Sequence, residues 1–599
     1  MLCVLRTVGT RRNALTLTCR IPTEILIEIF LHYQRPYFDL RNPVPAPEDK
    51  GTHSVLYGTS LGWVPAVAHV CRHWRTVAHE HPRLWSNVVL HLGRAWAQRT
   101  LALSKASPIV VALRNPITCD SITPASAVSR STRPAPTLDP ADVLLNHLSH
   151  IQNLELRACA CEASSWTPLL KAAAPLLEVL WLCIDPHEHG SALPNAPIAL
   201  PDNFLATHPR IRRLYLEQAF LANWVHGPSA LTQLVVFSIH APDPRSSPIS
   251  AATTLPTREQ LLDSLALMPA LEVLHLEHCL PAFVPAFSAR TVSLAHLRTA
   301  TLTDRVDRCR QLLDALDLHS TTRISVRCWS VSPLDTLRIL PTLAAHISPS
   351  GGGPQALTLS SCTAASTSGS SHTTQLKLAA WRAFATPTVA EDCESYAGPK
   401  VPHDVLLECE WAANSSSSSD PEMERRALLR ACECIALADL RALSLRADGA
   451  VWTASDWRAT FAGCTEITHV LAFDVPAESL LEALCPPKVN APLFQELVSL
   501  TLVGVNFVRA EEVAWSTLER SLVRRQKSPA CVTILDRVEL RACTVTEDAI
   551  DALKEFAAVV VWDSITDPNS WIHVPRDGAG DGEGEEEEEE DEDEDEDAG

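Results

Sequence analysis

The sequence of 599 residues has little glycine, methionine and tyrosine, with 20, 3 and 5 copies, and only 6% of it is aromatic. So few aromatic residues argue against an all-β sandwich and favour leucine-packed helices or repeats. Proline, in contrast, occurs 43 times, and it is excluded from the interior of long helices and central strands. We therefore expect many short elements joined by loops, organised as several domains or as one long repeat array.

The excess of negative charge is concentrated at the C-terminal end of the chain. The net charge is −21, but residues 577–599 hold sixteen acidic residues and no lysine or arginine. Without this run the net charge is about −5, an ordinary balance that gives no electrostatic reason to expect nucleic-acid binding. The tail, taken as 576–599, cannot bury apolar surface and is predicted to be disordered.

The nineteen cysteines include no Cys-x-x-Cys pair, and no secretory segment opens the chain. Reduced thiols in the cytoplasm or the nucleus are the simplest interpretation. No apolar run approaches the length of a membrane span, so no membrane partner is expected. Residues 1–20 carry four arginines and no acidic residue, which weakly resembles a transit peptide, but a disordered leader is the preferred interpretation.

Two amphipathic helices are predicted near the N-terminus. In the first, at 21–33, Pro22 suits the first turn, and one apolar stripe is formed by Ile25, Leu26, Ile29, Phe30 and Tyr33. The second starts near Pro65 and ends at His81 and Pro82, with one face formed by Ala66, Val67, Val70, Cys71, Trp74, Val77 and Ala78. Residues 34–60 contain proline, glycine and asparagine and are expected to form a loop.

Further along, the pattern Leu-x-x-Leu-x-Leu returns many times. Its copies are Ile151–Leu156, Leu177–Leu182, Ile211–Leu216, Leu231–Val236, Leu271–Leu276, Leu440–Leu445, Leu497–Leu502 and Leu535–Leu540. In a leucine-rich repeat the last Leu-x-Leu is a short strand with both leucines inward, and a following Asn or Cys satisfies backbone groups at the turn. Cysteine follows three copies, as Cys159, Cys279 and Cys543.

These copies predict an irregular leucine-rich-repeat-like α/β solenoid over 141–575, with helical patterns such as Arg258–Met268 between the strands. The spacing is uneven, with 26 residues from 151 to 177 and 40 from 231 to 271, so the repeats are degenerate. A non-repetitive α/β domain that is rich in leucine remains the alternative. Residues 91–140 are predicted to be a connector and linker, and flexible insertions are predicted at 348–375 and 412–422.

No assembled active site is recognised. His69 and His73 share a helix face in the predicted second helix, but no fourth ligand has a recognisable spacing, so no metal and no cofactor are assigned. Residues 58–62 form a literal Gly-x-Ser-x-Gly, yet too little chain precedes them for the inner strand that a nucleophile elbow needs. An enzyme that uses Ser60 stays an alternative that a serine-reactive probe would test. The chain is predicted not to be an enzyme.

Three pieces of the sequence resemble an F-box, and they occur in the order found in that family. They are IPTEILIEIF at 21–30, VCRHWR at 70–75 and PRLW at 82–85. The family pattern is roughly a Pro-x-Glu-Ile-Leu-x-x-Ile-Phe helix, a Val-Cys-basic-x-Trp helix and a closing Pro-x-Leu-Trp. The match covers about residues 21–90, with a loop at 34–60 that is longer than in a compact F-box, and it is most similar to F-box-like proteins of the large fungal families.

F-box proteins are substrate receptors of Skp–cullin–F-box ubiquitin ligases. The resemblance implies that residues 21–90 bind a Skp-type adaptor, and through it a cullin, while the repeats hold a protein target of unknown identity. By position it assigns adaptor contacts to Pro22, Ile25, Leu26 and Ile29, packing beside them to Val70, Cys71 and Trp74, and bracing of the unit to Leu84 and Trp85. It implies no catalytic residue, because the ubiquitin comes from a separate enzyme.

We therefore expect a small all-α F-box-like domain, a leucine-rich-repeat-like α/β solenoid and a disordered acidic tail, acting as a substrate adaptor in the cytoplasm or the nucleus. The alternative is a non-catalytic scaffold that binds basic partners such as histones through the acidic tail, since a polyacidic run can do so by charge alone. Deletion of residues 577–599 would separate the two, because only the scaffold would lose its main partner.

Overall fold

The computed structural model describes much of the chain between residues 20 and 563. The described residues are 20–34, 63–90, 92–114, 143–159, 166–185, 198–221, 224, 231–245, 255–282, 290–330, 335, 337–348, 352–365, 372–383, 403–413, 421–447, 452–473, 477–484, 493–505, 507, 513–528, 531 and 535–563. The leader, most of the predicted loop at 34–60, the linker after residue 114 and the acidic tail lie outside them. The predictions for these segments stay predictions.

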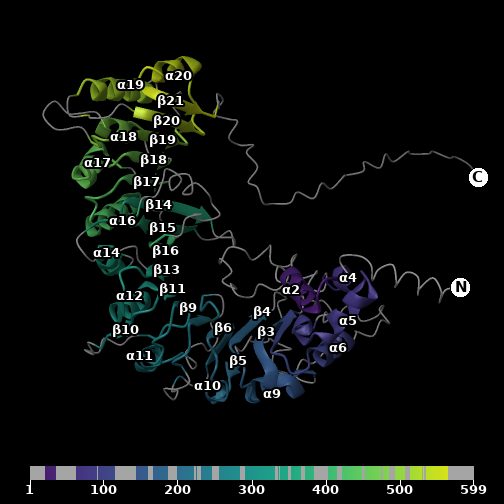
Figure 1. Ribbon diagram of the computed structural model, residues 1–599. Helices are drawn as coiled ribbons and strands as arrows, with labels where there is room; N and C mark the ends of the chain where they lie inside the picture. Colours follow the sequence, from purple (N-terminus) through teal and green to yellow (C-terminus); the bar gives the residue numbers. More distant parts are fainter. Residues whose placement is uncertain are drawn as a thin grey trace, which may run out of the picture.

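Four short helical elements at the N-terminal end form a unit with a hydrophobic core of its own (Figure 1). They are α2 (Thr23–Gln34), α4 (Trp63–Ala68), α5 (Arg72–Glu80) and the 3-10 helix η3 (Pro82–Trp85). The core contains Leu26, Phe30, Trp63, Val67, Val77, Ala78, Leu84 and Trp85. Full burial of one large apolar side chain contributes about 1.5 to 3 kcal/mol, so this cluster stabilises the unit substantially. The first predicted helix is confirmed.

The second predicted helix is interrupted, which corrects the prediction of one helix from Pro65 to His81. Helix α4 ends at Ala68, and α5 begins at Arg72. Cys71 is the N-cap of α5, and its Sγ accepts a hydrogen bond of 3.4 Å from the backbone N–H of Trp74. The predicted single stripe is therefore wrong at Val70, which lies in the turn and is 51% exposed. Helical periodicity did not show this break because cysteine is not among the preferred N-cap residues.

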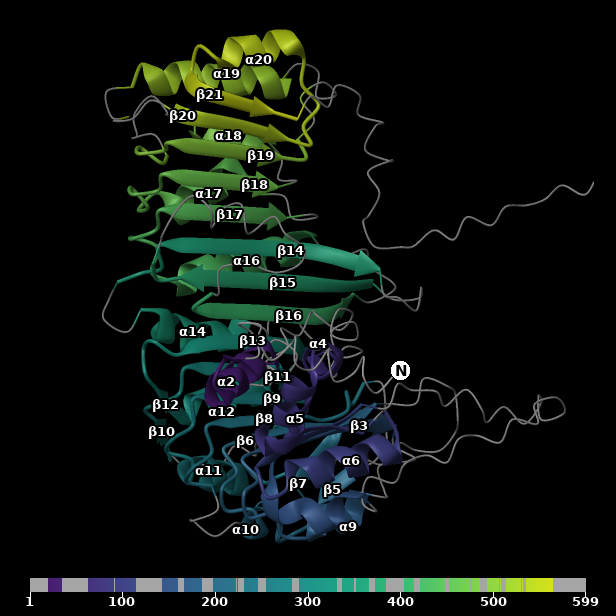
Figure 2. The ribbon, with the colours of Figure 1, turned by 45° about the vertical axis from the view of Figure 1, so that its right-hand side comes forward.

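A 17-stranded sheet runs through the rest of the described chain (Figures 1 and 2). Its spatial order is β1, β2, β3, β4, β6, β8, β9, β11, β13, β16, β15, β14, β17, β18, β19, β20 and β21. Among the described pairings of this sheet, only those of β15 are antiparallel. The fold is thus mixed α/β, with a large and mostly parallel sheet.

The strands of this sheet are short. Their bounds are β1 Asn87–Val89, β2 Ile109–Arg114, β3 Ile151–Cys159, β4 Val179–Asp185, β6 Arg213–Glu217, β8 Val236–His240, β9 Val273–Glu277, β11 Thr299–Arg305, β13 Arg323–Ser330, β14 Ala356–Ala365, β15 His372–Trp381, β16 Val405–Ala413, β17 Ala442–Ala447, β18 His469–Phe473, β19 Ser499–Val503, β20 Leu535–Arg541 and β21 Ala557–Trp562. Two further pairs, β5 (Ile198–Leu200) with β7 (Ala219–Leu221) and β10 (Val292–Leu294) with β12 (Leu316–Leu318), form small parallel sheets.

Helices line the outer side of the arc that the strands form in Figure 1. They are α9 (Thr167–Lys171), α10 (Phe204–Thr207), α11 (Arg258–Ala266), α12 (Val306–Asp314), α14 (Leu340–Ile347), α16 (Pro421–Cys434), α17 (Ala454–Phe461), α18 (Ala477–Leu484), α19 (Val513–Gln526) and α20 (Glu547–Leu553). One continuous hydrophobic core includes residues of the strands and of these helices. No helix among the described residues combines the length and the apolar composition needed to cross a bilayer.

The leucine copies occupy matching positions on neighbouring strands. Leu154 lies opposite Leu180, and Leu156 lies opposite Leu182. One copy was misplaced, because Leu214 and Leu216 face Phe237 and Ile239 rather than residues of 231–236. The copy of the sequence pattern that matches this register therefore begins three residues later, at Leu234, with Phe237 and Ile239 in place of its last two leucines.

Two segments, one predicted to be a connector and linker and the other a flexible insertion, contain regular structure. The connector at 91–140 includes α6 (Arg94–Ser104) and β2, and α6 packs against β1. The predicted flexible insertion at 348–375 contains all of β14 and the start of β15, which pair as a hairpin next to β16. Its serine and threonine residues suggested a loop, but Leu357 and Leu359 alternate with them and are buried, which is the period of a strand.

Candidate protein-binding surfaces and a polar cluster

Apolar side chains are exposed on one side of α2. Ile25 is 53% exposed, and Ile29 and Tyr33 are each 45% exposed. Because they are spaced by four residues, they lie on one face of the helix. Their neighbours Leu26 and Phe30 are at most 1% exposed and fill the core of the unit. The α2 stripe, defined as Ile25, Ile29 and Tyr33, therefore stays about half exposed on the folded unit.

The residues predicted to bind an adaptor divide into a surface group and an interior group. Pro22, Ile25, Ile29 and Val70 are exposed. Leu26, in contrast, is completely buried. The prediction that Leu26 contacts an adaptor is corrected, because its side chain fills the core between α2 and the other helices. The apolar stripe in the sequence did not show that Leu26 and Phe30 face inward whereas Ile25 and Ile29 face outward.

The remaining predicted residues hold the unit together. Trp74 is half-buried, and its ring lies 5.1 Å from that of Phe30. Leu84 and Trp85 are 1% and 2% exposed, and Trp85 Nε1 donates a hydrogen bond of 2.7 Å to the carbonyl of Ala78. Leu84 and Trp85 are therefore part of the core of the unit, and their bracing role stays a prediction.

The alternative chemistries gain no support from the described residues. His69 lies in the turn after α4, whereas His73 lies in α5, so the two do not share one helix face as predicted. The segment 58–62 with Ser60 lies outside the described residues. The acidic tail does so as well, and the scaffold alternative stays a prediction.

The open face of the sheet carries a row of polar side chains in one register. Glu217 lies opposite His240, and His240 lies opposite Glu277. The same row continues through Thr303, Arg327, Glu408 and Lys377. Glu408 forms ion pairs with both neighbours, at 2.8 Å from Arg327 Nε and 3.3 Å from Lys377 Nζ. The buried leucines point to the other side of these strands, so the row lies opposite the hydrophobic core.

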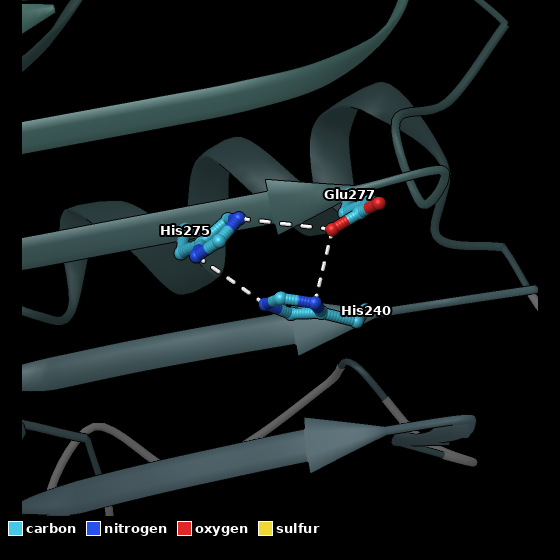
Figure 3. Close-up of side chains that lie close together, drawn as sticks. All are labelled: His240, His275 and Glu277. Carbon is cyan, nitrogen blue, oxygen red and sulfur yellow. Dashed lines mark hydrogen bonds and ion pairs between the residues drawn. The ribbon is translucent and has the colours of Figure 1, made fainter. Parts of the chain in front are cut away.

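His240 and Glu277 of this row lie close to His275, which is two residues before Glu277, and we call these three residues the β8–β9 cluster (Figure 3). His240 Nδ1 lies 2.9 Å from Glu277 Oε2, and His275 Nε2 lies 3.8 Å from the same oxygen. The two rings are tilted by 56° to each other, with His240 Nε2 at 3.3 Å from His275 Nδ1. The side chains are 21% to 30% exposed, so solvent reaches the cluster.

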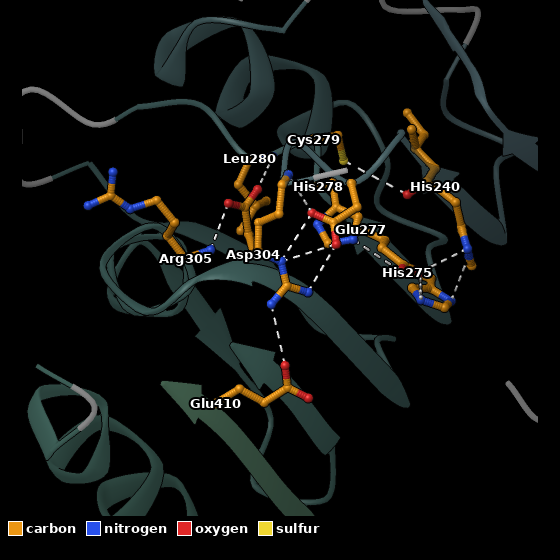
Figure 4. Close-up of polar contacts among 12 residues, drawn as sticks. His240, His275, Glu277, His278, Cys279, Leu280, Asp304, Arg305 and Glu410 are labelled. Carbon is orange, nitrogen blue, oxygen red and sulfur yellow. Dashed lines mark hydrogen bonds and ion pairs between the residues drawn. The ribbon is translucent and has the colours of Figure 1, made fainter. Parts of the chain in front are cut away.

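The turn that follows Glu277 is firmly anchored (Figure 4). His278 has a positive φ of 56°, and its Nε2 lies 3.5 Å from the second carboxylate oxygen of Glu277. Cys279 points into the core, where its thiol lies 3.9 Å from the carbonyl oxygen of Ile239. The backbone N–H of Leu280 donates to the buried carboxylate of Asp304 at 3.1 Å. These contacts fix where the end of β9 lies.

The protonation of these groups follows from burial and from their neighbours. Burial, reinforced by the charge of His240, lowers the pKa of His275 to about 3, so its ring is neutral at physiological pH. Burial alone would raise the pKa of Glu277, but hydrogen bonds to His240 and His278 outweigh it and lower that pKa. Burial raises the pKa of Asp304, although Arg308 opposes this. The cluster therefore combines a carboxylate with at least one neutral imidazole.

An arginine bridges this region to later strands. Arg245 follows β8, and its guanidinium lies 3.0 Å from Asp243 and 3.4 Å from Glu410 of β16. It also lies 4.8 Å from the ring centre of Trp329. These contacts connect β8 with β13 and β16 at the carboxyl-terminal ends of the strands, close to the β8–β9 cluster.

The sequence prediction assigned no role to the β8–β9 cluster. The available signal was the outward position in two neighbouring repeats, His275-x-Glu277 in one copy and His240 in the copy before it. The misplaced repeat at 231–236 hid the pairing of His240 with Glu277. Comparison of the chain with protein-family models gives no match, and comparison with curated proteins gives none.

Proposed function

We propose that the chain is an F-box-type substrate-recognition adaptor of a Skp–cullin–F-box ubiquitin ligase. In this proposal residues 21–90 form the F-box-like unit that binds a Skp-type adaptor, and through it a cullin. The strand array is an irregular leucine-rich-repeat solenoid that binds a protein target. The sequence pieces at 21–30, 70–75 and 82–85 support this proposal by their resemblance to the family.

The observation that carries the proposal is the α2 stripe. The unit has a closed core, yet Ile25 and Ile29 stay about half exposed, and so does the neighbouring Tyr33. Contiguous apolar surface on a folded protein typically marks an interaction site. An amphipathic helix that presents anchors at i, i+4 and i+8 suits helix-in-groove binding to a helical partner.

The open face of the sheet suits the second part of the proposal. Its outward side chains include acidic, basic and imidazole groups, such as Glu217, Arg327 and Lys377. Such a mixed polar surface can select a protein partner by complementary charge. The proposed adaptor would then act by proximity, with the α2 stripe anchored to the ligase and the strand array presenting the target. No residue of this chain would perform chemistry.

Binding to the Skp-type adaptor of the same organism tests the proposal. The double variant Ile25→Asp, Ile29→Asp places two charges on the α2 stripe without touching the buried Leu26 or Phe30. Loss of two apolar anchors should weaken binding by about 100-fold or more, since central anchors carry most of the energy of an interface. Calorimetric titration of the purified full chain measures this change.

The matched control is Val559→Asp, the same kind of change at a side chain that is 50% exposed in β21, at the other end of the sheet. It should bind the adaptor as tightly as the wild type. Unchanged binding of the double variant, or no complex with the wild-type chain, would overturn the proposal. Circular dichroism establishes that the variants are folded.

A further inference from the structure

Three metal-ligand groups converge on the open face of the sheet, and no part of the adaptor function requires them. We propose that His240, His275 and Glu277 form a binding site for a divalent transition-metal ion of the zinc class. One donor atom from each side chain lies within 4.8 Å of the other two. Among the described residues, this is the group of at least three histidine, cysteine or acidic residues that meets this condition.

The donor types select the class of ion. Two imidazoles and one carboxylate are a ligand set of zinc sites that keep an open coordination position. Imidazole nitrogen suits zinc and its first-row neighbours, whereas calcium and magnesium prefer oxygen ligands throughout. His275 and Glu277 would supply one nitrogen and one oxygen from a single strand, and His240 would supply the second nitrogen from the next.

The spacing fits an ion at the centre of the cluster. Ligand atoms about 2.0 to 2.2 Å from a tetrahedral zinc ion lie about 3.3 to 3.6 Å from each other. Glu277 Oε2 is 2.9 Å from His240 Nδ1 and 3.8 Å from His275 Nε2, so the two distances lie on either side of that range. Small side-chain rotations would equalise them, and the backbone does not need to move.

The backbone holds the three side chains on the same side of the sheet. His240 and Glu277 are paired in register on parallel strands, and His275 lies two residues before Glu277, which returns it to the same face. His278 contacts the second oxygen of Glu277, an outer contact of the kind that orients carboxylate ligands in metal sites. The site is therefore organised by the strands themselves.

A bound ion would have two consequences. It would join the ends of β8 and β9, and it would stabilise the folded chain because the unfolded chain offers no such site. Since the three side chains stay 21% to 30% exposed, a fourth coordination position would face the open side of the sheet. A water molecule, or a donor from a bound protein, could occupy this position.

The test is a titration of the purified, chelator-treated full chain with Co(II) and Zn(II) under reducing conditions. The visible bands of Co(II) report the ligand set, and elemental analysis reports the number of ions. Because the chain has other histidines and cysteines, the informative quantity is the difference from Glu277→Gln and His275→Ala. Both variants should bind one ion fewer and lose the corresponding Co(II) bands and the thermal stabilisation by Zn(II).

Two further variants sharpen the result. His469→Ala removes a half-buried histidine from β18 and should leave the number of ions and the bands unchanged. His278→Ala should keep the number but weaken the affinity about 10-fold or more, because it removes only the outer contact. Equal ion number and equal spectra in the wild type and in Glu277→Gln, a variant of nearly the same shape, would overturn the proposal. So would a wild-type chain that binds neither ion.

Discussion

At the scale of single residues, Trp85 shows how the helical unit is closed. Its ring is 2% exposed, lies 5.4 Å from that of Trp63 and stacks on His79 at 5.5 Å. Its Nε1 donates a hydrogen bond to the carbonyl of Ala78 near the end of α5. Trp85 therefore connects η3 with α4 and α5. It does not contact the α2 stripe through these interactions, so its effect on the stripe is indirect.

Replacement of Trp85 by phenylalanine should destabilise the helical unit by about 2 kcal/mol. The aromatic packing is largely kept, but the carbonyl of Ala78 loses a buried partner, which costs about 1 to 3 kcal/mol. Hydrogen exchange of peptides from residues 63–90 measures the effect locally. Trp96→Phe is the control, because Trp96 is 41% exposed and its replacement should change little. Equal exchange in the two variants would contradict the bracing role of Trp85.

In the turns after β9 and β20, the cysteine could be predicted from the sequence, whereas the positive φ of the residue before it could not. Cys543 was expected to satisfy backbone groups, and its thiol, whose pKa burial raises to about 12, donates to the carbonyl of Leu502 at 3.3 Å. The residue before it, Ala542, has a φ of 49°, and His278 has the same relation to Cys279. Positive φ is uncommon for any residue other than glycine, so composition gave no sign of it.

At the scale of elements, one ion pair joins neighbouring helices on the outer side of the arc. Arg425 of α16 makes two hydrogen bonds to Asp456 of α17, of 2.9 and 2.7 Å. Asp456 is 8% exposed, and it also accepts from the backbone N–H of Thr453, the N-cap of its own helix. The hydrogen bond from Arg425 is the main reason that the pKa of Asp456 falls to about 2. Burial opposes this shift, whereas the hydrogen bonds from Thr453 reinforce it.

The variant Asp456→Asn should show that this pair is sensitive to acid. A carboxyl whose pKa is lowered on folding stabilises the folded state above its ordinary pKa of 3.8, and this contribution is lost as pH falls towards about 2. We expect the wild type to be more stable than the variant by about 1 kcal/mol at neutral pH, since solvent still screens part of the pair. The difference in thermal midpoint should shrink between about pH 4 and pH 2.

The control for this experiment is Asp551→Asn, which removes a carboxylate that is 73% exposed and pairs with Lys554. This variant should differ little from the wild type at any pH. A wild-type advantage over Asp456→Asn that persists unchanged to pH 2 would contradict the role of the charged pair.

Elements were predictable where hydrophobic periodicity was strong. Helix α2 and the register of Leu154 with Leu180 follow from their spacing alone. The break at Cys71 and the hairpin of β14 and β15 were not predicted, since a cysteine N-cap and a serine-rich strand oppose the usual composition. The β8–β9 cluster depends on cross-strand register, which one repeat misplaced by three residues was enough to hide.

At the scale of the whole molecule, each described strand of the sheet pairs only with its immediate neighbours. β20 pairs with β19 and β21, whereas β3 pairs with β2 and β4 at the other end of the array. In such a one-dimensional arrangement, stability is close to a sum of units and nearest-neighbour contacts. Between these ends, β15 is antiparallel to both of its neighbours, β14 and β16, and is the exception to the parallel order of the described strands of this sheet.

Two reciprocal variants test whether the array behaves in this local manner. Leu540→Ala in β20 and Leu156→Ala in β3 each remove a fully buried side chain, at a cost of about 2 to 5 kcal/mol. Because coupling passes only between neighbours, Leu540→Ala should speed hydrogen exchange in β19 to β21 and leave β2 to β4 unchanged, and Leu156→Ala should do the opposite. If either variant accelerated exchange equally along the whole sheet, the array would unfold as one cooperative unit, and a target bound at one end would stabilise the other.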